Sequence, residues 1–147
     1  MKRHGQRVCI VMADDDEDDR HATRDALLRH RIESDFRQVK DGNELLDFLH
    51  QRNGYDDAPR PGLILLDLNM PRKDGREALR EIKGDPFFRT IPVVVLSTSD
   101  FEEDIAGSYD LGANSFVTKP VTMEGYVRVV GDIGRYWLET VALPAGV

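Results

Sequence analysis

The stretch LILLDLNMPRKDG, residues 63–75, decides the fold of this chain. Its first four residues are apolar, which is typical of a strand buried on both faces, and the carboxylate of Asp67 follows directly. A polar turn with Pro71 and Gly75 comes next. The carboxyl ends of parallel strands form the ligand-binding edge of an open α/β sheet, so Asp67 is a candidate functional residue. A lone aspartate after a strand is an N-cap or turn residue about as often as it is a reactive group.

A second apolar run ends in the same way. Residues 8–13, VCIVMA, lead into three consecutive carboxylates, Asp14, Asp15 and Asp16. The presence of acids directly after two predicted strands favours a functional site over a simple turn.

Extended and helical patterns alternate along the whole chain. Strands are expected at residues 8–13, 34–39, 63–66, 93–96 and 115–118. Helices are expected from a cap at Asp18 or Asp19 to about residue 30, and at residues 44–51, 76–83, 101–111 and 122–140. Ser99 and Glu102 predict a capping box at the fourth helix. The alternation predicts an α/β fold with a doubly wound parallel sheet, five helices on its two faces and an extended last helix.

Composition narrows the classes of function. The 147 residues suit one domain, and 27 acidic against 20 basic residues give a net charge of −7. This charge is opposite to the one that direct nucleic-acid binding requires. The single cysteine, Cys9, can form no internal disulfide, and no apolar run is long enough to span a membrane. We therefore expect a cytoplasmic protein with no direct nucleic-acid or membrane partner and a short basic tail at residues 1–7.

Polar groups end four of the five predicted strands. They converge in one pocket if the first and third strands are neighbours at the switch point of the sheet. Considered alone, each has a simpler explanation, such as a strand-end cap or a lysine that flanks a helix. The groups are Asp14 with Asp15, Asp67, Ser97 and Lys119.

Three further acids near the first strand are excluded from this pocket. Asp16, Asp18 and Asp19 fall in the first turn of the predicted helix, where the helix dipole favours negative charge.

Four motifs together resemble the receiver domain of two-component response regulators. They are the pair Asp14–Asp15, LLDLNMPRKDG around Asp67, LSTS at residues 96–99 and FVTKP at residues 116–120. The resemblance implies a flavodoxin-like sheet of five strands in the order 2-1-3-4-5. The stretch SYDLGANSFVTKP and the tail YWLETVALPAGV are similar to small receivers that work with bacterial phytochrome-type sensor histidine kinases.

The family implies that Asp67 accepts a phosphoryl group from a phosphohistidine of a sensor histidine kinase. It also implies a Mg²⁺ ion, for which Mn²⁺ is a possible substitute. Asp15, Asp67 and the backbone carbonyl of Asn69 would bind the metal directly, and Asp14 would act through water.

The resemblance assigns further roles around the acceptor. Lys119 and the Ser97 hydroxyl would bind phosphate oxygens. Met70 and Pro71 would shape the turn, and the peptide bond between Lys119 and Pro120 is expected to be cis. The remaining residue, Phe116, is either the aromatic that moves when Ser97 moves or a permanently buried core residue.

The receiver is expected at residues 8–135, with residues 136–147 forming the end of the last helix and a tail, and no output domain. A signal would then leave through protein contacts. We expect a homodimer through the fourth helix, fifth strand and last helix, although the apolar residues after Tyr136 could instead fold back on their own domain.

Two rival functions use similar residues. A pseudo-receiver would bind a partner without phosphorylation, but the complete set of acids, serine and lysine argues against it. A phosphatase of the haloacid dehalogenase kind resembles D-x-D, and here Asn69 stands at the second acidic position. We therefore expect a receiver and no enzyme with turnover of small phosphate esters.

Overall fold

The computed structural model describes residues 7–144, and residues 1–6 and 145–147 lie outside the described part. The predicted basic tail therefore falls almost wholly outside it, as do the last three residues of the predicted C-terminal tail. In the described chain, five parallel strands form one sheet in the order β2-β1-β3-β4-β5, and five α-helices connect and follow them. This confirms the predicted doubly wound fold and its strand order.

Strands and α-helices alternate along residues 7–144. The strands are β1 (Cys9–Ala13), β2 (Asp35–Val39), β3 (Leu63–Leu66), β4 (Val93–Ser97) and β5 (Ser115–Thr118). The helices are α1 (Glu17–Arg29), α2 (Gly42–His50), α3 (Gly75–Gly84), α4 (Glu102–Asp110) and α5 (Met123–Arg135), which a π-helical turn, Tyr136–Thr140, extends.

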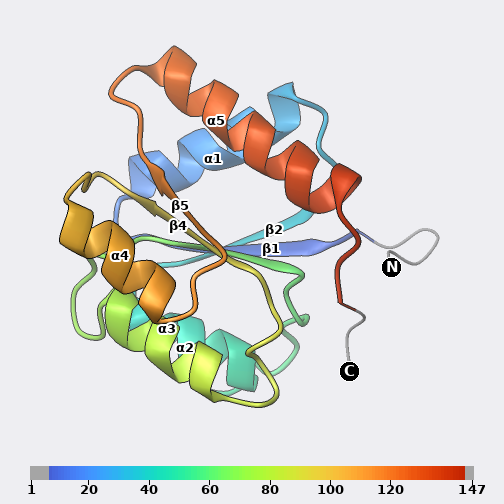
Figure 1. Cartoon of the computed structure of the whole chain (residues 1–147). Coiled ribbons are helices and arrows are strands. Elements are labelled where there is room, and N and C mark those ends of the chain that lie inside the picture. The colour runs from blue at the N-terminus through green and yellow to red at the C-terminus, as the bar shows by residue number, and fades with distance from the viewer. Residues whose placement is uncertain (1–6, 145–147) are drawn as a thin grey trace.

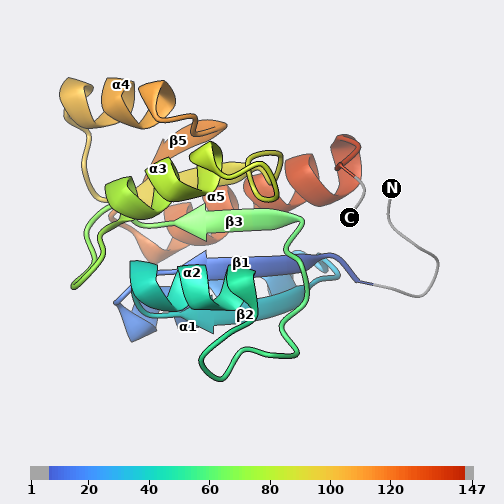
Figure 2. The same ribbon diagram turned by 90° about the horizontal axis from the view of Figure 1, so that it is seen from below.

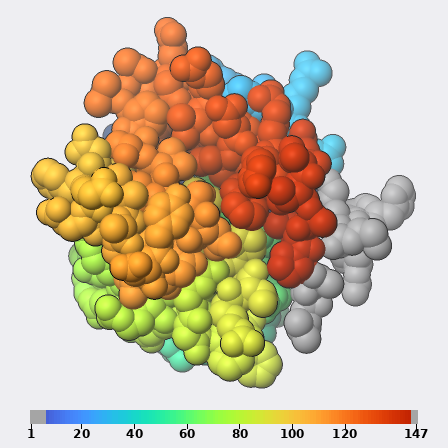
Figure 3. Space-filling model, in the orientation of Figure 1, coloured from blue at the N-terminus to red at the C-terminus, as the bar shows by residue number. Residues whose placement is uncertain are grey.

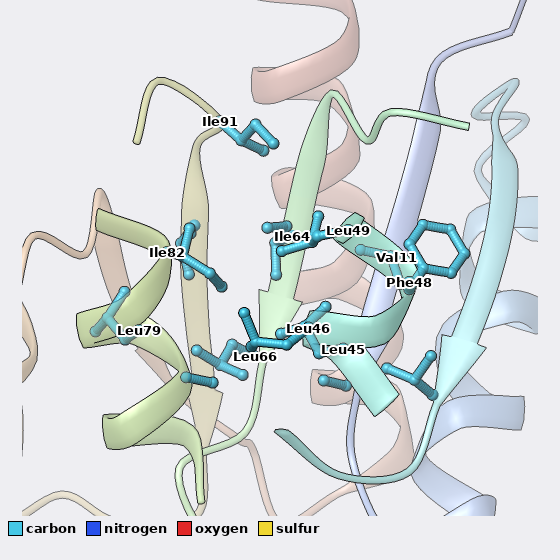
Figure 4. Close-up of a cluster of buried hydrophobic side chains, with 14 of the residues drawn as sticks. Val11, Leu45, Leu46, Phe48, Leu49, Ile64, Leu66, Leu79, Ile82 and Ile91 are labelled. Atoms are coloured by element: carbon cyan, nitrogen blue, oxygen red, sulfur yellow. The ribbon is translucent and has the colours of Figure 1, made fainter. Parts of the chain in front are cut away.

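The sheet separates two apolar cores (Figure 1). Successive residues of a strand point to opposite faces, so β1 sends Val11 to one core and Ile10 to the other. Helices α1 and α5 cover the side of Ile10, and α2 and α3 cover the side of Val11. Figure 4 shows side chains of α2 and α3, including Leu45 and Leu79, packed over the central strands. Burial on both faces explains the uniformly apolar sequence of β3.

All strands run in the same direction, so their carboxyl ends lie at one edge of the sheet (Figure 2). Strands β1 and β3 are neighbours there, and the backbone N–H of Asp67 donates to the carbonyl of Ala13 at 3.0 Å. The chain turns to opposite faces after these two strands. The acids that follow β1 and β3 are thereby brought together at the switch point of the sheet.

Helices α1 and α2 begin earlier than the sequence predicts. Helix α1 is capped by Asp16, whose side chain accepts from the N–H groups of Asp18 and Asp19. Helix α2 begins earlier than predicted, because Asp41 caps it through the N–H of Glu44. Thus these acids serve as caps where the residue pattern suggested a later start or a turn.

Helix α4 lacks the predicted capping box. Its N-cap is Phe101, which makes no side-chain capping hydrogen bond, and the hydroxyl of Ser99 instead donates to Asp104 at 2.6 Å. A capping box would require the Ser99 hydroxyl to accept from the N–H of Glu102, but it accepts from the N–H of Phe101 at 3.2 Å.

The last helix is extended, as predicted, and part of its apolar end is used internally. Trp137 and Leu138 pack against the core formed with α1 and α5. Among the described residues, no helix is long and apolar enough to cross a membrane.

Candidate phosphoryl-acceptor site

Three carboxylates meet at the carboxyl edge of the sheet. One oxygen from each of Asp14, Asp15 and Asp67 lies within 4.8 Å of the others. Asp14 and Asp67 are buried, whereas Asp15 is exposed. The carboxylate of Asp14 accepts from the N–H of Asp16 at 2.9 Å, and this bond fixes the turn that presents Asp15. The predicted acidic pocket therefore forms, with one side open to solvent.

Asp67 sits in an environment that resists its negative charge. Burial is the main cause that raises its pKa to about 6, with Lys119 opposing the shift and Asp14 adding to it. The N–H of Asn69 contacts its Oδ1 at 3.3 Å. Three close carboxylates need a cation to stay ionised together, and such oxygen ligands suit a hard divalent metal. The residues present thus fit a divalent metal at this edge.

Lys119 follows β5, and its ammonium group lies close to three carboxylates of the pocket. Its Nζ lies 2.7 Å from Asp14 Oδ2, 2.7 Å from Asp19 Oδ2 and 3.6 Å from Asp67 Oδ2. Burial alone would lower its pKa, but the hydrogen bonds to Asp14 and Asp19 outweigh burial and raise it. The lysine therefore stays charged beside the acceptor.

Asp19 is the residue that the sequence analysis missed. Its place in the first helical turn led us to exclude it, but the turn faces the pocket and the carboxylate pairs with Lys119. The signal was weak, because Asp16 and Asp18 precede it and both belong to the exposed turn. Only the three-dimensional packing separates the three.

Ser97 ends β4 inside the protein and is fully buried. Its hydroxyl oxygen accepts from the N–H of Ser99 at 3.2 Å. Ser99 is in turn held by Asp104 of α4, and the second carboxylate oxygen of Asp104 accepts from Arg76 of α3 at 2.8 Å. A continuous polar path thus runs from the Ser97 hydroxyl to helices α3 and α4.

The loop after Asp67 is fixed from both sides. Within the loop, Gly75 donates its N–H to the carbonyl of Leu68 at 2.9 Å. Outside it, the buried carboxylate of Asp41 accepts from Arg72, which has a left-handed φ of 62°, at 2.8 Å.

Met70 and Pro71, the two residues predicted to shape this turn, differ from each other in burial. Met70 is buried in the core beneath the loop, and Pro71 lies on its exposed side. Asn69, the predicted carbonyl ligand, is exposed.

Two predictions around β5 need revision or refinement. The peptide bond between Lys119 and Pro120 is trans, because the described residues contain no cis peptide bond. The cis prediction is therefore wrong, and the observed form is the one that proline bonds ordinarily prefer. Phe116 is half-buried and packs at the margin of the core, and its N–H donates to the Tyr109 hydroxyl at 3.1 Å. It is not a fully enclosed core residue.

The family model described as "Response regulator receiver domain" matches residues 10–130. Response regulator Rcp1 of Synechocystis sp. is 43% identical over 136 residues, which cover 92% of each chain.

Solved structures of response regulators are also similar to this chain. The phosphorylated cyanobacterial phytochrome response regulator RcpA has 43% identity and a TM-score of 0.91, covering 95% of this chain and 100% of its own. The Mn²⁺-bound form of response regulator Rcp1 has 42% identity and a TM-score of 0.89, covering 94% and 99%.

Proposed function

The chain belongs to the response regulator receiver family of two-component systems, and we propose that Asp67 is its phosphoryl acceptor. The observation that carries this proposal is the meeting of Asp14, Asp15 and Asp67 within 4.8 Å beside the ammonium group of Lys119. Phosphoryl transfer needs an oxygen nucleophile together with positive charge, of which Lys119 supplies one part and a divalent metal on the three carboxylates would supply the rest.

The reaction is a transfer between two protein side chains. An oxygen of the Asp67 carboxylate attacks phosphorus, the bond from phosphorus to the donor imidazole nitrogen breaks, and that nitrogen keeps the electron pair. The product is an acyl phosphate on Asp67. The nucleophile must be ionised. The pKa of Asp67, although raised to about 6, still leaves the carboxylate mostly ionised at neutral pH.

We propose Mg²⁺ as the metal, held by Asp15, Asp67 and the carbonyl of Asn69, with Asp14 acting through water and Mn²⁺ as a possible substitute. When bound, the metal would neutralise the acids and stabilise negative charge on the phosphoryl oxygens. A relative crystallised in its Mn²⁺-bound form supports a divalent metal in this family.

Two side chains are suited to bind the transferred group. The Lys119 ammonium lies 3.6 Å from the acceptor oxygen, and the Ser97 hydroxyl donor can turn toward a new acceptor. Turning the hydroxyl would disturb the loop from Ser97 to Ser99, which contacts α4 through Asp104. This path supports a switch in which Phe116 and α4 respond to phosphorylation.

We propose a sensor histidine kinase as the partner, and a bacterial phytochrome as the kind of sensor, because RcpA is described as a phytochrome response regulator. The setting would be the cytoplasm, and the receiver would comprise residues 8–135. The output would be protein contacts, including a homodimer through the face of α4, β5 and α5 that Figure 3 shows. Helix α4 and the π-helical turn after α5 expose the large apolar side chains of Tyr109 and Tyr136, respectively.

Intact mass after incubation with acetyl phosphate and Mg²⁺ tests the acceptor. Wild type should gain one phosphoryl group, and Asp67→Asn should gain none while keeping its circular dichroism spectrum. Asp57→Asn, which removes the same charge from an exposed loop position, is the matched control and should label like wild type. Equal labelling of wild type and Asp67→Asn would reject the proposal, and failure of wild type to label even from a kinase would favour a pseudo-receiver.

A further inference from the structure

Asp19 occupies one of the three N–H donors of Lys119. The ammonium group gives one hydrogen bond to Asp14 and one to Asp19, each at 2.7 Å. Asp67 Oδ2 lies 3.6 Å away, beyond an ordinary hydrogen bond. Asp14 and Asp19 therefore hydrogen-bond to Lys119, whereas Asp67 attracts it only electrostatically.

The two acids that hold Lys119 differ in burial. The side chain of Asp14 is 0% exposed, whereas that of Asp19 is 29% exposed. Separating Asp14 from its cation would leave an unpaired charge in the interior, which is strongly unfavourable. Asp19 can be hydrated after it is released. Asp19 is therefore the partner that Lys119 can exchange at lower cost.

Packing between two helices fixes Asp19 at this position. Its backbone carbonyl accepts from the hydroxyl of Thr23 at 2.8 Å and contacts the hydroxyl of Tyr126, on α5, at 3.4 Å. These two hydroxyl groups also bond to each other at 2.8 Å. The carboxylate thus stays near Lys119 whether or not the two are paired.

We propose that Asp19 is a positioning residue that holds Lys119 back from Asp67 and releases it to a phosphoryl oxygen. The proposal rests on Asp67 being the acceptor. Hydrogen bonds are exchanged, and the covalent step is unchanged. Asp19 then lowers the affinity of the pocket for the phosphoryl group, because the Asp19–Lys119 pair holds the ammonium group 3.6 Å from the acceptor oxygen and must open for the ammonium to come closer.

Removing the Asp19 carboxylate has two consequences of opposite sign. Without a phosphoryl group, the freed N–H of Lys119 can bond to Asp67 and compete with a divalent cation for that carboxylate. With a phosphoryl group, the same N–H binds it without first breaking an ion pair. Metal affinity should therefore fall while affinity for a phosphoryl mimic rises. General damage to the pocket would weaken both.

The test is calorimetric titration of wild type, Asp19→Asn and Asp18→Asn, first with Mg²⁺ and then with beryllofluoride at saturating Mg²⁺. Asp18 is the matched control, because it is exposed in the same helical turn and carries the same charge. The hydrogen bonds of Lys119 go to Asp14 and Asp19, so Asp18→Asn changes the net charge equally and leaves them intact.

Relative to Asp18→Asn, Asp19→Asn should weaken Mg²⁺ binding about threefold and strengthen beryllofluoride binding about threefold to tenfold. Identical behaviour of the two variants would overturn the proposal, and so would weaker binding of both ligands by Asp19→Asn. If wild type itself failed to bind beryllofluoride, the proposed function would fail and this inference with it. If wild type binds and the two variants match, only the inference fails.

Discussion

Helices α3 and α4 lie next to each other (Figure 2), but they are attached to the protein in different ways. Helix α3 buries Ala78, Leu79 and Ile82, and the side chain of Asp74 caps it. Helix α4 buries only Ser108 and has no side-chain cap. Apolar packing therefore holds α3, whereas α4 depends largely on polar contacts.

This difference divides the site into a fixed and an adjustable part. The loop that carries Asp67 ends at Gly75, the first residue of α3, and is thereby fixed to the core. The loop that carries Ser97 leads into α4 and is linked to it through Ser99 and Asp104. We infer that α4 can move in response to Asp67 at little cost in core packing.

The largest expected contrast is in core truncation. Leu79→Ala should lower the free energy of unfolding by about 3 kcal/mol, because Leu79 is fully buried in α3. Ile105→Ala in α4 should cost about 1 kcal/mol, because Ile105 is only half-buried. Urea denaturation measures both. Equal losses would show that α4 is packed as firmly as α3.

The second contrast is between the pKa values of two carboxylates, Asp67 in the pocket and Asp104 in α4. Between pH 7 and pH 5 the ionised fraction of Asp67 should fall from about nine-tenths to about one-tenth, given its pKa of about 6. Protons then displace the metal, and apparent Mg²⁺ affinity should drop about tenfold across this range. The pKa of Asp104 is instead lowered by its hydrogen bonds to Ser99 and Arg76.

Asp104→Asn is therefore the control for this titration, and it should leave the pH dependence of Mg²⁺ binding unchanged. A Mg²⁺ affinity that is constant from pH 7 to pH 5 in wild type would contradict the assignment of Asp67 as a ligand.

The third contrast uses one substitution at two glycines. A Cβ on Gly107 of α4 would meet nothing within 4 Å, so Gly107→Ala should raise stability by about 1 kcal/mol. A Cβ on Gly75 of α3 would lie 2.1 Å from the carbonyl oxygen of Asp67, so Gly75→Ala should destabilise. Thermal denaturation distinguishes the signs, and a destabilising Gly107→Ala would mean that α4 has hidden contacts.

The smallest effect concerns the ion pair that joins the two helices. Arg76→Ala removes the contact between Arg76 Nη2 and Asp104 Oδ1. Amide exchange should then quicken in α4 and remain as in wild type in α3, because apolar packing holds α3 independently. Arg80→Ala, an exposed position on the same helix, is the control. Equal acceleration in both helices would indicate a general loss of stability.

Local sequence patterns predict the elements of this chain correctly where they agree with the fold. The apolar runs that end at Asp14 and Asp67 predicted two strands, which follows from burial periodicity. The family resemblance implied that these strands are neighbours, and the general geometry of parallel sheets then predicted the carboxylate cluster.

The errors arose where tertiary contacts select among similar residues. Asp16 and Asp19 belong to one acidic run, but their roles differ. Asp16 caps α1, whereas Asp19 binds Lys119, which follows the outer strand β5. Ser99 likewise suited a capping box but bonds to Asp104 instead. The trans bond before Pro120 could not be derived from the residues, since proline permits both isomers.

Identification of the phosphorylated residue tests the central claim most directly. Reduction of the acyl phosphate with borohydride converts the acceptor aspartate into homoserine, which peptide mass spectrometry can locate. After incubation with acetyl phosphate and Mg²⁺, we predict conversion at Asp67 and at neither Asp14 nor Asp15. Conversion at another aspartate, or stable phosphate without any conversion, would contradict the account.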